Sequence, residues 1–148
     1  MHLENLSTWI SEQESSIETA LRNLVEINTY TANKAGVDDG MDALSQLAQD
    51  HDLTTKTING RHRLITAGDG TSKPRIMLIS HMDTVFPPNG DFLHYEDIGD
   101  GFRRGPGVGD IKGGIIIGLW SMLALSKMVE TFDVQMIVSA DEEKGSPT

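Results

Sequence analysis

Two short apolar segments separated by a longer one constrain the fold of this chain more than any other feature. Residues 76–79 form a near-continuous apolar run of strand length, and residues 132–140 contain a second run rich in Val, Met and Ile. Between them, residues 115–129 are apolar over the length of a helix. Such strands are typical of a parallel sheet that is buried on both faces. The order strand, helix, strand predicts a right-handed βαβ unit, and with it an α/β fold with a mostly parallel sheet flanked by helices.

The N-terminal half of the chain is predicted to supply two helices and a hairpin. Apolar residues recur at helical spacing in residues 6–28 and again in residues 41–51, so each segment predicts an amphipathic helix. Residues 30–39 between them are polar and predict a loop. Residues 53–58 alternate and are rich in threonine, and an Asn-Gly pair directly after them predicts a hairpin to a partner strand at residues 63–67.

Composition and charge exclude several classes of partner. The 148 residues, the usual length of one domain, include 22 acidic and 12 basic residues, for a net charge of −10. This balance predicts no nucleic-acid partner, because phosphate binding needs clustered Lys and Arg. The longest apolar run, residues 115–125, is far shorter than the roughly 20 residues of a membrane span, which predicts no membrane partner. Residues 1–16 lack the apolar core of a signal peptide, so a cytoplasmic location is expected.

Three clusters of acidic residues and histidine lie where predicted elements begin or end. His81 and Asp83 follow the first apolar strand, Asp110 precedes the apolar helix within a glycine-rich segment, and Glu142 and Glu143 follow the last strand. The carboxyl ends of parallel strands meet at one edge of a sheet, where ligands bind in α/β folds. The chain has no cysteine, so any metal must bind to His, Asp and Glu. We therefore expect these clusters to form one metal site.

Each cluster taken alone has a second interpretation. His81 with Asp83 could be a metal ligand and the carboxylate that orients it, or a polar turn. The glycine segment around Asp110 has neither dinucleotide nor Walker spacing, and it could hold a carboxylate in a cleft or form a flexible surface turn. Glu142 and Glu143 point in different directions from a strand end, so that one could bind a metal while the other acts as a base, or both could belong to a solvated turn. The combination of all three favours metal-assisted hydrolysis.

The three clusters resemble the sequence motifs of a known family. These motifs read Ser-His-Met-Asp-Thr-Val at residues 80–85, Gly-Pro-Gly-Val-Gly-Asp-Ile-Lys-Gly-Gly at residues 105–114 and Asp-Glu-Glu-Lys-Gly-Ser at residues 141–146. They look like the dizinc exopeptidase and deacylase family, which includes glutamate carboxypeptidases, aminoacylases, acetylornithine deacetylase and succinyl-diaminopimelate desuccinylase. The resemblance covers nearly the whole chain and is closest to the glutamate carboxypeptidase branch.

The resemblance implies a role for each site residue. His81 would bind one zinc ion, Asp110 would bridge both ions, and Glu143 would bind the other. Glu142 would be the general base, and Asp83 would orient His81 from behind. The peptide bond after Asp110 is often cis in this family. The native metal could be zinc, cobalt or manganese, because nitrogen and oxygen ligands accept all three.

The same resemblance implies that part of the enzyme is absent from this sequence. Family members continue with a further acidic ligand, a lid or dimerisation domain and a C-terminal histidine ligand. Residues 1–148 are thus expected to be the N-terminal portion of the catalytic domain, without the lid domain and the rest of the catalytic domain. Two protein ligands per zinc fall short of the three that are typical of catalytic sites, so we expect weak or absent metal binding by this chain alone. An uncovered sheet surface is also expected, which could support a homo-oligomer.

Three functional hypotheses follow. The first is a zinc-dependent hydrolase of amide bonds in N-acyl amino acids or small peptides with a free carboxylate, present here as an inactive fragment. The second is a non-catalytic remnant that serves as an oligomerising or partner-binding domain. The third is another metal hydrolase such as a phosphoesterase, which would need more histidines in motifs than His81 alone.

Overall fold

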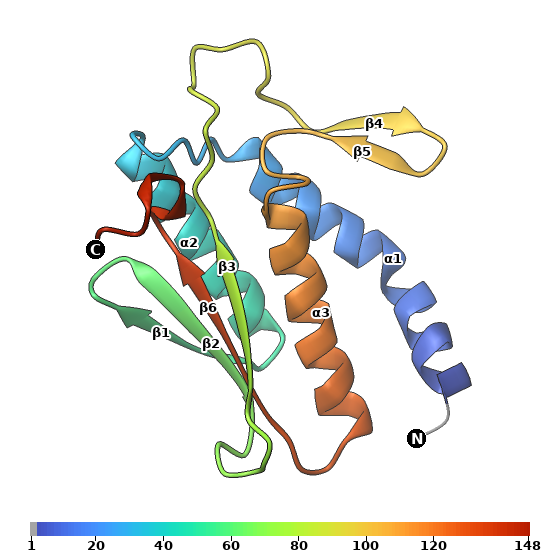
Figure 1. Cartoon of the computed structure of the whole chain (residues 1–148). Helices are drawn as coiled ribbons and strands as arrows, with labels where there is room; N and C mark the ends of the chain where they lie inside the picture. Colours follow the sequence, from blue (N-terminus) through green and yellow to red (C-terminus); the bar gives the residue numbers. More distant parts are fainter. Residues whose placement is uncertain (1–2) are drawn as a thin grey trace.

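The computed structural model describes residues 3–148. Three helices lie on one side of a four-stranded sheet, and a separate two-stranded hairpin projects beyond the end of the sheet (Figure 1). In chain order the elements are α1 Leu3–Glu26, α2 Lys34–Asp50, β1 Thr54–Ile58, β2 His62–Gly68, β3 Ile76–His81, β4 Glu96–Gly99, β5 Phe102–Arg104, α3 Lys112–Met128, β6 Asp133–Ser139 and the 3-10 turn η1 Glu142–Lys144.

The α/β class and the βαβ unit are confirmed, but the sheet is mixed. The strand order is β1-β2-β6-β3, and only β3 and β6 pair in parallel, through the α3 crossover. β2 pairs antiparallel with both β1 and β6. The prediction of a mostly parallel sheet therefore holds only for β3 and β6. The predicted hairpin accounts for the difference: Asn59 and Gly60 both have positive φ, as a tight turn requires, and the hairpin docks on β6 through β2.

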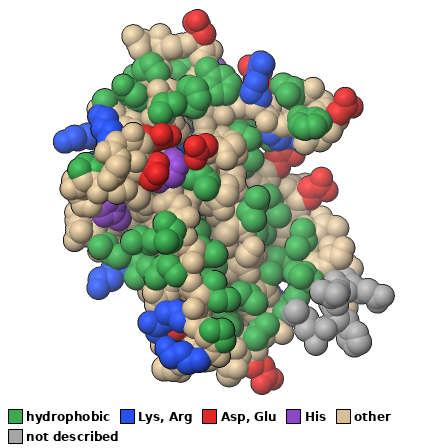
Figure 2. All heavy atoms as spheres, viewed as in Figure 1, with side chains coloured by type: hydrophobic (Ala, Val, Ile, Leu, Met, Phe, Trp, Pro, Cys, Tyr) green, Lys and Arg blue, Asp and Glu red, His purple; other side chains and the backbone are tan. Residues whose placement is uncertain are grey.

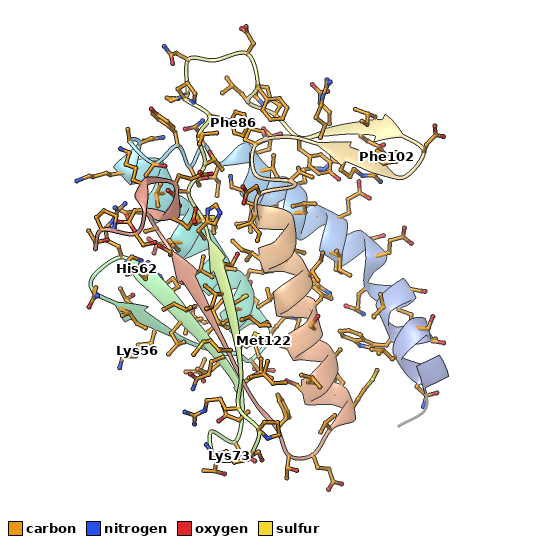
Figure 3. The ribbon with its side chains drawn as sticks, viewed as in Figure 1. Lys56, His62, Lys73, Phe86, Phe102 and Met122 are labelled. Carbon is orange, nitrogen blue, oxygen red and sulfur yellow. The ribbon has the colours of Figure 1, made fainter. Side chains whose placement is uncertain are left out.

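The hydrophobic core lies between the sheet and the helices. Alternate residues of β2 and β6 point into it, including Ile65, Met136 and Val138. From the helix side, Met122 of α3 lies in the same core (Figure 3). The helix α3 is the most apolar of the three, which explains why it occupies the centre of the helical layer between α1 and the sheet (Figure 1).

The expectation that the apolar strand at residues 76–79 is buried on both faces is wrong. This strand, β3, lies at the edge of the sheet and pairs only with β6 among the described residues. Ile76 and Met77 are about half exposed, and Ile79 is 79% exposed. An apolar run of this kind occurs in central strands and in edge strands alike. The position of β3 at the edge of the sheet, and not its sequence, therefore determines how far its side chains are buried.

Local polar contacts move other boundaries away from their predicted positions. The helix α2 begins at Lys34, within the predicted loop, because the side chain of Asn33 caps it by accepting a hydrogen bond from the Gly36 amide at 3.2 Å. The hairpin of β4 and β5 was not predicted. It turns at Asp100 and Gly101, which both have positive φ, and its strands are too short to give a clear pattern.

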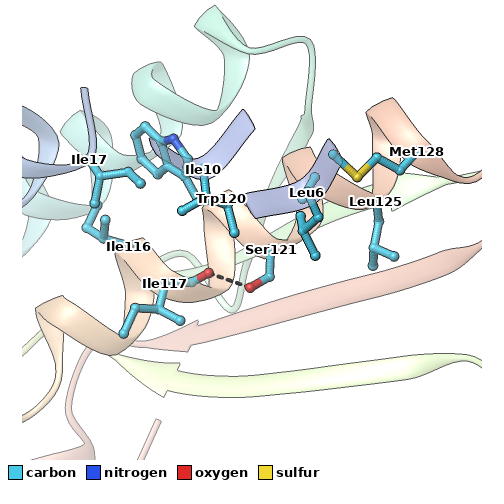
Figure 4. Close-up of a pocket in the computed structure, with 10 residues that line it drawn as sticks. Leu6, Ile10, Ile17, Ile116, Ile117, Trp120, Ser121, Leu125 and Met128 are labelled. Atoms are coloured by element: carbon cyan, nitrogen blue, oxygen red, sulfur yellow. Dashed lines mark hydrogen bonds between the residues drawn. The ribbon is translucent and has the colours of Figure 1, made fainter. Parts of the chain in front are cut away.

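An apolar groove of about 440 Å³ lies between α1 and α3 (Figure 4). Ile10 and Ile17 line it from α1, and Ile117, Trp120 and Leu125 line it from α3. The described part of the chain contains no helix that is both long enough and apolar enough to cross a membrane.

The Asn33 cap can be tested by measuring stability. We expect Asn33→Ala to lower the free energy of unfolding by about 1 kcal/mol, because the first turn of α2 loses its side-chain acceptor. Urea denaturation followed by circular dichroism measures the change. Asp39→Ala, at an exposed position of the same helix, is the control and should change stability much less; equal effects of the two substitutions would contradict a capping role.

Candidate metal centre

His81 lies at the end of β3 and is buried. Its Nε2 atom lies 3.0 Å from Oδ1 of Asp110. Its Nδ1 atom lies 2.9 Å from the main-chain oxygen of Asp83 and 3.4 Å from Oδ1 of the same residue. The ring is therefore oriented from behind by both the main chain and the side chain of Asp83, while Nε2 faces the other acidic residues.

The carboxylate of Asp83 is fully buried and joins two parts of the site. It accepts hydrogen bonds from the Thr31 hydroxyl at 2.8 Å and from the amides of Glu142 and Glu143 at 3.0 and 3.2 Å. Burial alone would raise the pKa of Asp83, but its hydrogen bonds, first among them the one from His81, hold that pKa below its ordinary value. Asp83 thus stays ionised and fixes the turn η1 against the end of β3.

Asp110 extends from the glycine segment just before α3, and its side chain is 78% exposed. The peptide bond between Asp110 and Ile111 is cis, as the resemblance implied. The preceding segment is buried at Gly105 and Gly107, which both have positive φ, so it is packed rather than a flexible surface turn. The backbone therefore presents the Asp110 carboxylate to His81 from a buried support.

Glu142 and Glu143 lie on the 3-10 turn η1 and not at an extended strand end, so the predicted alternation of a strand does not apply to them. Oε2 of Glu142 lies 3.7 Å from Nε2 of His81, and the side chain is half exposed. The pKa of Glu143 is raised, first by burial and then by the neighbouring carboxylates, while His81 lowers it. Both glutamates therefore face the same histidine.

Three of these side chains form a group suited to a metal ion. One ligand atom each from His81, Asp110 and Glu143 all lie within 4.8 Å of one another. Each donor lies about 2.0–2.2 Å from a zinc ion, so two donors on the same ion can be at most about 4.4 Å apart. The spacing of the three ligand atoms therefore suits one ion after small side-chain rotations, or two ions that share a ligand. Figure 2 shows acidic side chains gathered around a histidine on the same face. The donor types and the spacing fit zinc, cobalt or manganese.

The charge of the group depends strongly on pH. The pKa of His81 is raised from 6.5 to about 9, first by the side chain of Asp83 and then by its main-chain oxygen and Asp110, against the opposing effect of burial. Without a metal, the imidazolium therefore balances part of the surrounding negative charge. Protonated His81 stabilises the folded state. This stabilisation is fully present below pH 6.5 and is lost as the pH rises through about 9.

All five residues predicted from the sequence lie together in the structure. Thr31, which also contacts the site, was not predicted. This threonine is buried and lies far from the motifs in sequence, in a polar segment predicted only as a loop. Its role depends on a contact between loops that only the folded chain reveals.

Solved structures share this fold. Human carnosine dipeptidase 1 superposes with a TM-score of 0.83 at 16% identity, over 98% of this chain and 36% of its own. A dipeptidase from Saccharomyces cerevisiae has a TM-score of 0.77 at 17% identity, over 93% of this chain and 34% of its own. A tripeptidase from Staphylococcus aureus has a TM-score of 0.69 at 20% identity, over 89% of this chain and 38% of its own. The chain thus has a fold found in dipeptidases and a tripeptidase, and it spans about a third of their length.

A protein-family model matches the C-terminal part of the chain. Residues 77–148 match the model of peptidase family M20/M25/M40, and all three motifs lie in that range. This match confirms the resemblance of the motifs to dizinc exopeptidases over the C-terminal part of the chain. The comparison with curated proteins finds no match. The glutamate carboxypeptidase branch is not confirmed and stays a prediction.

Metal binding should release a proton from His81. At pH 7 the imidazole is protonated in the metal-free chain, and a histidine ligand must be neutral, so we expect about one proton to leave when the ion at His81 binds. Zinc affinity should then rise about tenfold per pH unit up to about pH 9. Calorimetric titrations in buffers of different ionisation enthalpy measure the release. His94→Gln, at an exposed histidine outside the metal-ligand group, should leave the release unchanged, and binding enthalpies independent of the buffer would rule out His81 as the proton source.

Proposed function

We propose that this chain is the N-terminal portion of the catalytic domain of a metal-dependent hydrolase that cleaves amide bonds in short peptides or N-acyl amino acids. The observation that carries the proposal is the meeting of His81, Asp110 and Glu143 at one edge of the sheet, with Glu142 beside them. The match of residues 77–148 to a peptidase family model supports the reaction class. The solved structures named as dipeptidases and a tripeptidase support short peptides as the substrate class.

In this proposal His81 would hold one metal ion, Glu143 would hold a second, and Asp110 would be a ligand shared by both, as the resemblance implies. Zinc is the first candidate, with cobalt or manganese as alternatives for the same ligand types. A bound divalent ion lowers the pKa of a water molecule toward about 7 and polarises the substrate carbonyl. Asp83 keeps His81 in the orientation that presents Nε2 to the metal, because it holds Nδ1 from the other side.

Glu142 is the proposed general base. Its backbone is fixed by the hydrogen bond to Asp83, while its carboxylate is half exposed and free to reach a water molecule near His81. It would accept a proton from the attacking water and then donate it to the leaving amide nitrogen. A glutamate with a fixed backbone and a solvent-facing carboxylate is suited both to accept this proton and to donate it.

The remnant hypothesis is the second candidate. The exposed aliphatic side chains of β3 favour it, because an edge strand of this kind is suited to contact with another chain. Under this hypothesis the motifs persist without their chemistry, and the chain acts through its surface.

The role of Glu142 can be tested in the protein that carries this chain. We expect Glu142→Gln to reduce kcat for dipeptide or N-acyl amino acid hydrolysis by about 10²- to 10⁴-fold, because the amide cannot accept the proton. Bound metal should be unchanged, which elemental analysis checks. Glu130→Gln, at an exposed position away from the motifs, is the matched control and should keep full activity. Wild-type turnover by the Glu142 variant would refute the assigned role.

Zinc titration of the 148-residue chain separates the two candidates. Two protein ligands per ion give weak binding, so we expect the isolated chain to bind zinc only weakly and His81→Ala to abolish what binding there is. Calorimetry measures both. Tight binding of two ions would contradict the remnant hypothesis, whereas zinc uptake that does not depend on His81 would count against the proposed site.

A further inference from the structure

Residues 24–31, here called the exit segment of α1, contact the metal centre from behind at two separate points. We propose that the exit segment is the common support that positions Asp110 through Lys112, and positions Glu142 and Glu143 through Thr31 and Asp83. This inference deepens the proposed function and rests on it. The segment lies outside the range that matches the family model, which begins at residue 77.

The first contact is the side chain of Lys112, two residues after Asp110. This lysine is fully buried, and its Nζ donates to the main-chain oxygens of Leu24 at 2.9 Å and Ile27 at 2.8 Å. The helix α1 has no basic residue of its own in its last turn. Since the last carbonyls of a helix have no donors within the helix itself, the amino group of Lys112 supplies hydrogen-bond donors to them from another element. Its side chain therefore ties the first residue of α3 to the end of α1.

The glycine segment closes around this lysine. A Cβ atom at Gly107 would lie 2.9 Å from Cγ of Lys112, and a Cβ atom at Gly105 would lie 2.6 Å from Cγ1 of Val25. Only glycine allows the segment to pack this closely against both the lysine stem and the exit segment. Asp110 thus lies between two anchored points, with the packed glycines before it and Lys112 after it.

The second contact is Thr31 at the other end of the exit segment. Its hydroxyl donates to Oδ2 of Asp83 at 2.8 Å, and its amide donates to the main-chain oxygen of Thr84 at 3.0 Å. The Thr84 amide in turn donates to the main-chain oxygen of Thr29 at 2.8 Å. The segment after α1 is therefore paired with the chain that follows β3, and its hydroxyl completes the set of donors around Asp83.

The two contacts together couple the ligands to one another. Asp110 is held at one end of the exit segment, and Asp83, which binds the amides of Glu142 and Glu143, is held at the other. The separation between the Asp110 and Glu143 carboxylates therefore depends on the conformation of this segment. Lys112 and Thr31 are positioning residues, because neither side chain belongs to the metal-ligand group.

Two variants of the 148-residue chain test this assignment. Lys112→Met removes the hydrogen-bond donors of the amino group while keeping an unbranched side chain, and Thr31→Val removes only the hydroxyl. Met122→Ala, in the core on the same helix as Lys112, is the control for loss of stability alone. Zinc affinity, followed by NMR shifts of the His81 ring, should fall about 10- to 100-fold in each positioning variant and stay unchanged in the control. Equal affinity in all four proteins would overturn the proposal.

Amide hydrogen exchange provides a readout that does not depend on metal. Thr31→Val should speed exchange at Glu142 and Glu143, and Lys112→Met should speed exchange at Thr31 and Thr84, beyond what the Met122 control shows. Changes confined to the level of the control would overturn the positioning role even if zinc binds. If the wild-type chain binds no zinc, the proposed metal site fails in this chain, and the exchange data alone decide whether the exit segment positions these residues.

Discussion

The buried carboxylate of Asp83 is the interaction on which the rest of the site depends. It accepts hydrogen bonds from the Thr31 hydroxyl and from two consecutive amides at the start of η1, and it lies against the ring of His81. A buried carboxylate without such donors would be costly to ionise, and here the donors come from three parts of the chain. The loop after α1, the end of β3 and the turn after β6 are thereby held at one point.

The parallel pairing of β3 and β6 makes this convergence possible. His81 at the end of β3 is paired in register with Ser139 at the end of β6, so the residues that follow each strand emerge side by side. The crossover helix α3 begins close to the same edge, which places Asp110 opposite the two strand ends (Figure 1). A single βαβ unit thus supplies every residue of the candidate metal group, and the N-terminal half of the chain supports it from behind.

Local sequence was sufficient to predict the βαβ unit and the meeting of the three motifs, because strand ends and their parallel order fix where His81 and Glu143 lie. It also indicated the Asn-Gly hairpin correctly. It could not predict that β3 is exposed, because Ile76 to Ile79 read the same at an edge as at the centre of a sheet. Nor could it find Thr31 or Lys112 as supports, since a buried lysine that caps another helix looks in sequence like any charged residue near a loop. What escaped prediction in each case depends on contacts between elements that are distant in the chain.

The two edges of the sheet are built differently. The outer strand β1 carries the exposed Lys56, a charge that discourages further strand pairing (Figure 3). The outer strand β3 carries no charge before His81, and its backbone is open on one side. Of the two edges, the one at β3 is therefore better suited to a further strand. A strand added in parallel along β3 would bring its own C-terminal end close to His81 and Asp110. The same strand that widens the sheet could therefore also place further side chains beside the metal-ligand group.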